Sequence, residues 1–103
     1  MADRLKSLLE LYEKDPNDSF VSYGIALEYI SLKDYETAEK YLSSLLSADP
    51  EYVPAYMQLA QIKEKLNLFD DAADLYKKGI KTARDQGETH AANEMEEFLN
   101  ELE

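Results

Sequence analysis

The sequence predicts an all-α fold of about six antiparallel helices that repeat in pairs. Two observations lead to this prediction. Apolar residues recur every three or four positions in six successive segments, as on one face of a helix, and no segment alternates like a strand. The chain also matches itself when it is shifted by 34 residues, a period typical of stacked helical units. Because the chain has only 103 residues, we expect a single domain, residues 1–103.

The self-match pairs residues of the same kind. Apolar residues fall on apolar residues, alanine falls on alanine, and one Asp-Pro pair falls on the other. The pairs are Asp15-Pro16 with Asp49-Pro50, Ile25-Ala26 with Leu59-Ala60, Leu32 with Leu66, Tyr35 with Phe69, Ala38 with Ala72, and Leu42 with Tyr76. These matches define one repeat at residues 19–52 and a second at residues 53–86.

The first half of the chain is expected to form three helices. Residues 2–17 are interpreted as an N-terminal half-repeat, whose helix over residues 2–14 has a leucine-rich stripe and ends at an Asp-Pro pair. A helix over residues 20–31 is apolar on two sides, which suggests contacts on both. Asp34 is a plausible N-cap for the next helix. That helix must end before Pro50, because the residue that precedes a proline avoids the helical conformation.

The second half is expected to follow the same plan. A helix begins near Tyr52–Pro54, with the proline in its first turn, and runs to about Leu66. The next helix runs from about Phe69 to Asp85, a turn longer than its counterpart, and Gly87 is a good C-terminal stop. Residues 88–102 are predicted to form a C-terminal capping helix with apolar residues on one side and glutamates elsewhere.

Composition argues against several classes of function. The chain has 22 acidic and 11 basic residues, a net charge of −11, and no cluster of Lys and Arg to bind nucleic acid or an anionic membrane. No apolar run approaches the ~18–20 residues of a membrane span. Residues 1–10 lack a secretory apolar region, so a cytoplasmic location is expected. There is no cysteine, so neither disulfides nor thiolate metal sites can form.

The sequence offers no catalytic constellation, so we expect no enzyme activity, no cofactor and no metal. The single histidine, His90, has Glu94 four residues away, but two ligands make no zinc site. No oxygen-rich loop with a glycine turn is present for calcium, and no glycine loop is present for phosphate.

These residues resemble the tetratricopeptide repeat (TPR) family over residues 19–85, and more loosely at both ends. The features that carry the likeness are the period of 34, the small Ala26 and Ala60, the aromatic and alanine residues that open each second helix, and the closing Asp-Pro. The resemblance implies a right-handed α-solenoid. The sequence departs from the family pattern at three places. Ser22 stands where the family has an aromatic residue, although Tyr56 supplies that residue in the second repeat, and Lys33 and Asn67 stand where the family has a glycine between helices. The second repeat ends in Arg84-Asp85-Gln86-Gly87 in place of a closing Asp-Pro. The last helix keeps the family spacing only if its register slides by one or two residues.

The resemblance also implies where and what the protein binds. In the family, the first helix of each repeat lines a concave face that receives a peptide or a partner helix. The predicted partner-binding residues are Phe20, Tyr23, Leu27, Ile30, Met57, Gln61 and Glu64. The expected function is therefore a protein–protein interaction module or scaffold. Two alternatives stay open: the flanking half-repeats cover this apolar set, or it joins two copies in a homodimer.

The expected ligand is a protein or peptide with apolar anchors flanked by Lys or Arg. One TPR subclass holds acidic C-terminal tails with a clamp of cationic and amide side chains, because a carboxylate needs such donors to replace lost water. The comparable positions here carry Tyr23, Leu27, Met57, Gln58 and Gln61, with no cation among them. A basic flank also suits a chain of net charge −11.

Overall fold

The computed structural model describes residues 2–103, so Met1 of the predicted domain lies outside the described residues. In that range it contains six α-helices and no strand, and the helices hold 82% of the chain. They are α1 (Ala2–Lys14), α2 (Ser19–Ser31), α3 (Tyr35–Ala48), α4 (Val53–Lys65), α5 (Phe69–Asp85) and α6 (Thr89–Leu102). The predicted all-α fold class is confirmed, and the six helices begin and end within one or two residues of the predicted helix bounds.

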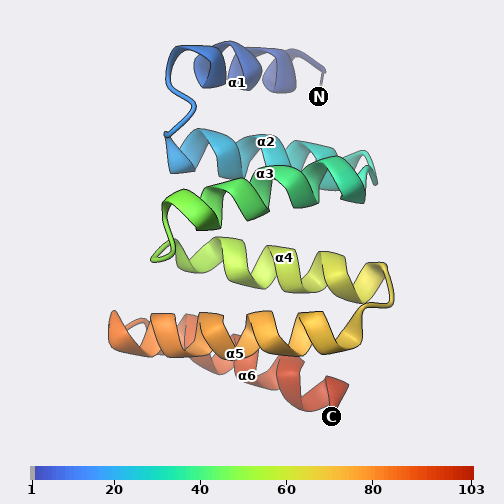
Figure 1. The fold of residues 1–103 in the computed structure, drawn as a ribbon, viewed down its shortest axis with the longest axis vertical. Coiled ribbons are helices and arrows are strands. Elements are labelled where there is room, and N and C mark those ends of the chain that lie inside the picture. The colour runs from blue at the N-terminus through green and yellow to red at the C-terminus, as the bar shows by residue number, and fades with distance from the viewer. Residues whose placement is uncertain (1) are drawn as a thin grey trace. The chain divides into compact units, whose positions relative to one another are not determined.

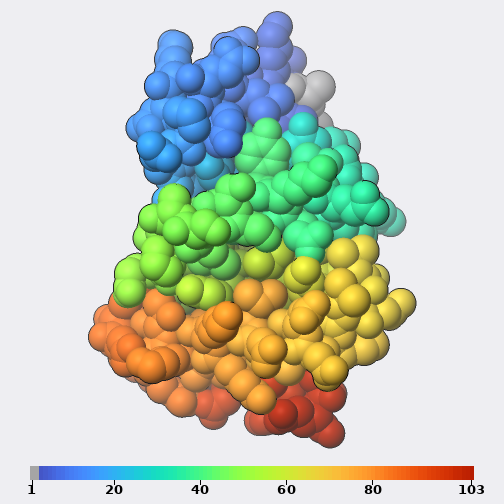
Figure 2. Space-filling view, viewed as in Figure 1, coloured from blue at the N-terminus to red at the C-terminus, as the bar shows by residue number. Residues whose placement is uncertain are grey.

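The helices form two compact units. Residues Met1–Pro50 hold α1, α2 and α3, and residues Glu51–Glu103 hold α4, α5 and α6. Within each unit, successive helices run antiparallel to one another (Figure 1). Figure 2 shows that side chains fill the spaces between the helices, both in the first unit (blue to green) and in the second unit (yellow to red).

In the first unit, α2 packs between α1 and α3. Gly24 lets α1 approach closely, because a Cβ atom at this position would lie 3.3 Å from a methyl carbon of Leu8. Tyr41 of α3 stacks on Tyr29 of α2, with ring centroids 5.9 Å apart, and meets Tyr12 of α1 edge-on at 5.4 Å. Aromatic side chains from all three helices therefore meet at Tyr41.

In the second unit, α5 packs against both α4 and α6. Gly79 lies where α5 is in close contact with both α4 and α6. A Cβ atom there would lie 2.6 Å from Sδ of Met95 on α6 and 2.7 Å from Cβ of Tyr56 on α4. Both neighbouring side chains are buried, so the absence of a side chain at Gly79 is a packing requirement.

Two aspartates fix where helices of the first unit begin. The carboxylate of Asp34 accepts a hydrogen bond from the backbone N–H of Thr37 at 3.2 Å, which confirms the predicted N-cap. Asp18 does the same for α2 through the N–H of Val21 at 3.3 Å. In the second repeat, Leu68 holds the position of Asp34 and makes no side-chain cap.

Three helices end in the same hydrogen-bonded turn. After α2, α4 and α5, two successive backbone N–H groups bond back to carbonyls of the last turn, and the first of those two residues has a positive φ. These residues are Lys33 (φ 61°), Asn67 (φ 63°) and Gly87 (φ 75°). Lys33 and Asn67 therefore stand in the left-handed conformation that the glycine of the repeat pattern adopts without strain.

We expect Lys33→Gly to raise the free energy of unfolding by about 0.5–1 kcal/mol. The left-handed conformation costs a lysine about 1–2 kcal/mol, and the greater entropy of an unfolded glycine offsets part of the gain. Asn67→Gly should gain less, because asparagine tolerates this conformation better. Urea unfolding followed by circular dichroism measures both changes. A loss of stability in Lys33→Gly would contradict this account of the turn.

Candidate functional site

One groove of the second unit is lined by residues from α4, the start of α5 and the last turns of α6. It encloses about 480 Å³. Its lining residues are Gln61, Glu64, Lys65, Phe69, Phe98 and Glu101. Side chains three or four residues apart share one face of a helix, so α4 and α6 each present their contribution along a single stripe. This surface is called the α4–α6 groove below.

Tyr76 of α5 supports the groove from beneath. Its side chain is fully buried, and its hydroxyl donates a hydrogen bond of 2.5 Å to Oε2 of Glu64. Its ring also stacks on Phe98, with centroids 5.9 Å apart and the ring planes inclined by 15°. One buried residue therefore positions both a carboxylate and an aromatic ring of the groove wall.

The groove carries a net negative charge, which contributes to the raised pKa of Tyr76. Burial raises the pKa of the Tyr76 hydroxyl, and the hydrogen bond to Glu64 and the charges of Glu64 and Glu101 raise it further. The hydroxyl thus stays protonated and remains a donor to Glu64. Two carboxylates line the groove against one ammonium group, that of Lys65.

Carboxylates beside aromatic rings can bind a cationic side chain. The carboxylates of Glu64 and Glu101 can accept hydrogen bonds from an ammonium or guanidinium group. The rings of Phe69 and Phe98 can contact its aliphatic stem or take the cation over their faces. Phe69 is 50% exposed, so a large apolar surface is open to a partner at this point.

The predicted binding residues are divided between the two units. Phe20 is in the first turn of α2 and 72% exposed, whereas the other three on α2 are half-buried. Met57, Gln61 and Glu64 are half-buried on α4. Of the predicted set, Gln61 and Glu64 line the α4–α6 groove and Met57 does not.

Sequence reasoning missed Phe69, Phe98 and Glu101 as groove residues. The sequence pattern indicates Phe69 only as a residue that opens the second helix of its repeat, and it indicates α6 only as a cap. The starts of the helices in the structure show what α6 corresponds to. Helices α2, α4 and α6 begin at Ser19, Val53 and Thr89, which lie 34 and then 36 residues apart. Helix α6 thus corresponds to the first helix of a third repeat, and its inner face faces the groove.

None of the helices in residues 2–103 is long and apolar enough to cross a bilayer. In the same residues, no three His, Cys, Asp or Glu side chains lie close enough together to hold a metal ion.

Comparison with known proteins identifies the family. A family model described as tetratricopeptide repeat matches residues 29–93. A tetratricopeptide repeat domain protein from Salinibacter ruber is 32% identical and superposes with a TM-score of 0.82 over 86% of this chain and 90% of that chain. A TPR repeat-containing protein from Pseudomonas aeruginosa is 23% identical over 99 residues, which are 96% of this chain and 94% of the relative.

The fold is also that of a TPR domain solved with its ligand. The TPR2B domain of yeast Sti1, in complex with pHsp70, has a TM-score of 0.89 over 95% of this chain and 78% of that chain, at 16% identity. At that identity the likeness concerns the fold alone. The family match covers well over half of the residues, and a relative of nearly full coverage shares 32% of the sequence. This chain therefore belongs to the tetratricopeptide repeat family.

Proposed function

We propose that this protein is an interaction module that holds a segment of another polypeptide in the α4–α6 groove. The observation that carries the proposal is the pairing of Glu64 and Glu101 with Phe69 and Phe98 around one open groove. A cavity lined by helix surfaces, with no catalytic constellation, suits binding better than chemistry. The yeast TPR2B domain, solved with pHsp70, supports a protein ligand for this fold.

The groove favours a partner segment with Lys or Arg next to apolar anchors. A cationic side chain would lie between the two carboxylates, and an apolar neighbour would cover the exposed ring of Phe69. An acidic tail would meet two carboxylates and only one cation, Lys65, in a chain of net charge −11. Like charges brought together at an interface disfavour association, so acidic tails are the poorer ligands.

The half-buried apolar residues of α2 offer further contacts. Tyr23, Leu27 and Ile30 recur at helical spacing, and each keeps part of its side chain exposed. We propose that they and Phe20 bind apolar anchors of a partner in the first unit, and that Met57 does so in the second unit. Leu27→Glu should then weaken binding more than it lowers stability, because it brings a charge into a desolvated contact.

The first test is a titration with two peptide sets, one basic and amphipathic and the other ending in acidic residues. We expect the basic set to bind, and its Kd to rise as sodium chloride increases from 50 to 500 mM, because salt screens the attraction between exposed charges. Isothermal titration calorimetry gives both affinities. Tighter binding of the acidic set would overturn the proposal. If the mass in solution doubles as the protein concentration rises, and the dimer no longer binds the peptides, the homodimer is favoured instead.

Matched variants test the groove itself. Glu101→Gln should weaken binding of the basic peptide by about two- to fivefold. Glu97→Gln changes the net charge by the same amount on an exposed part of the same helix, and it should leave the affinity unchanged. Phe69→Ala should weaken binding about tenfold, and Leu68→Ala, at an exposed neighbour outside the groove, should not. Equal effects within each pair would place the binding site elsewhere.

A further inference from the structure

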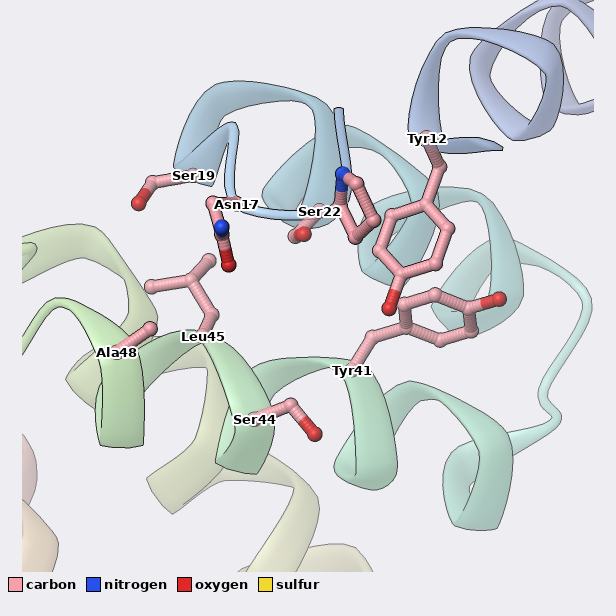
Figure 3. A pocket seen from close by; sticks show the side chains of 9 residues that line it. Tyr12, Asn17, Ser19, Ser22, Tyr41, Ser44, Leu45 and Ala48 are labelled. Atoms are coloured by element: carbon pink, nitrogen blue, oxygen red, sulfur yellow. The ribbon is translucent and has the colours of Figure 1, made fainter. Parts of the chain in front are cut away.

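A second cavity lies in the first unit, between the end of α1, the start of α2 and α3. It encloses about 170 Å³ and is separate from every residue of the α4–α6 groove. Figure 3 shows the rings of Tyr12 and Tyr41 on one side of the space, Leu45 and Ala48 on the other, and Ser22 at its edge. No function proposed above uses this cavity.

The two repeats differ in the residues at this cavity. Ser22 occupies the position that Tyr56 holds 34 residues later, so the first repeat lacks a large aromatic ring. Tyr56 is buried and packs against Gly79, whose counterpart in the first repeat is Leu45. The first repeat thus has a serine and a leucine where the second has a tyrosine and a glycine, and both Ser22 and Leu45 line the cavity.

The walls of the cavity are fixed by contacts within the unit. Tyr41 is held between Tyr29, on which it stacks, and Tyr12, which meets it edge-on with the planes inclined by 73°. At the opposite side, the hydroxyl of Ser19 donates a hydrogen bond of 2.9 Å to Oδ2 of Asp49. The space is therefore a formed cavity that needs no rearrangement of these residues to admit a ligand.

Size and chemistry define what the cavity can hold. An apolar protein cavity of about 150 Å³ is large enough for one benzene molecule, so this space suits one six-membered ring. Tyr12 and Tyr41 offer aromatic surfaces, on which a ring packs edge to face or offset. The lining also includes the hydroxyls of Ser22 and Ser44 and no charged side chain. Hydroxyls can bond a polar substituent on a ring, whereas an anionic ligand would find no cationic side chain among the lining residues.

We infer that this cavity binds an uncharged aromatic ring that carries a hydroxyl group. Such a phenol can come from two sources: a free small molecule, or the tyrosine side chain of a protein. The cavity would then add a second recognition point to the chain, independent of the acidic groove.

The test uses p-cresol and N-acetyl-tyrosinamide as probes, with amide chemical shifts as the readout. We expect p-cresol to give saturable shifts confined to residues near 12–22 and 41–48, with a Kd on the order of 1 mM for so small a ligand. Binding of N-acetyl-tyrosinamide as well would assign the site to a protein tyrosine, and binding of p-cresol alone would assign it to a small phenol. Absence of saturable binding by both probes would overturn the inference.

Variants at the cavity mouth provide the control. Ala48 and Ser47 are both exposed neighbours on α3, but only Ala48 lines the cavity. Ala48→Leu should raise the Kd of p-cresol at least about tenfold, whereas Ser47→Leu should leave it unchanged. Ser22→Tyr, which supplies the missing ring from within, should abolish binding. If Ala48→Leu and Ser47→Leu bind p-cresol equally, the cavity is not the site.

Discussion

Gly79→Ala is expected to lower the free energy of unfolding by about 1–3 kcal/mol, although alanine favours a helix more than glycine does. The added methyl group would lie 2.6 Å from Sδ of Met95 and 2.7 Å from Cβ of Tyr56. The methionine side chain can move, but the Cβ atom of Tyr56 is bonded to the backbone of α4. Helices α4 and α5 must therefore separate, which loosens a buried contact.

Gly24→Ala provides the matched comparison, because this glycine also lies inside a helix. Its added methyl group would meet only the end of the Leu8 side chain, at 3.3 and 3.4 Å. Leu8 is half-buried and can move by a few tenths of an ångström. The gain in helix propensity, up to about 1 kcal/mol, should then dominate. Urea unfolding of both variants should give changes of opposite sign, and equal destabilisation would contradict the packing described at Gly79.

The helices could be predicted because their signals are local. Asp34 caps α3, Pro50 follows the end of that helix, and Gly87 closes α5 with a positive φ, as its position in the sequence indicates. The 34-residue period gave α2 and α4 their register in the same way. Each of these features depends on residues within a few positions or on one constant offset, so a single sequence contains them.

The groove could not be predicted, because its second wall lies beyond a break in that offset. Helix α5 has 17 residues where α3 has 14, so α6 begins 36 residues after α4 rather than 34. Two residues turn a helix by about 200°, which moves a side chain to the opposite face. The sequence indicated a longer α5 and a slide of one or two residues. It could not select between the two slides, so Phe98 and Glu101 had no assigned face.

The hydrogen bond beneath the groove depends on the packing of α5 against α4. Tyr76 was expected only as the apolar counterpart of Leu42, which is also fully buried. The pattern of apolar positions indicates that a residue is buried, but it does not indicate where a hydroxyl group finds its acceptor. The contact between Tyr76 and Glu64 therefore required the three-dimensional structure.

The largest pH effect is expected above pH 10, where Tyr76 makes the fold sensitive to alkali. The pKa of its hydroxyl is raised by burial, by the hydrogen bond to Glu64 and by the charges of Glu64 and Glu101. The folded state thus keeps a proton that the unfolded state releases near the ordinary tyrosine value of about 10. This contribution to stability is complete below pH 10 and is lost as the pH rises further.

Tyr76→Phe isolates this effect. At pH 7 the variant should be less stable by about 1 kcal/mol, because Glu64 loses its donor. Between pH 10 and 12 its stability should fall less steeply than that of the wild type, because no buried hydroxyl has to ionise at position 76. Some slope will remain, since burial and the neighbouring Tyr29 and Tyr12 also raise the pKa of Tyr41.

The measurement is urea unfolding at a series of pH values, with Tyr35→Phe as the control for the loss of one phenol from a half-buried position. All three proteins share their other ionisable groups, so the difference between the curves reports the substituted tyrosine. We expect the curve of Tyr35→Phe to run parallel to that of the wild type and the curve of Tyr76→Phe to approach it as the pH rises. If the gap between Tyr76→Phe and the wild type stayed constant from pH 7 to pH 12, ionisation of Tyr76 would not limit stability in alkali, and the charge of the groove would have to be reconsidered.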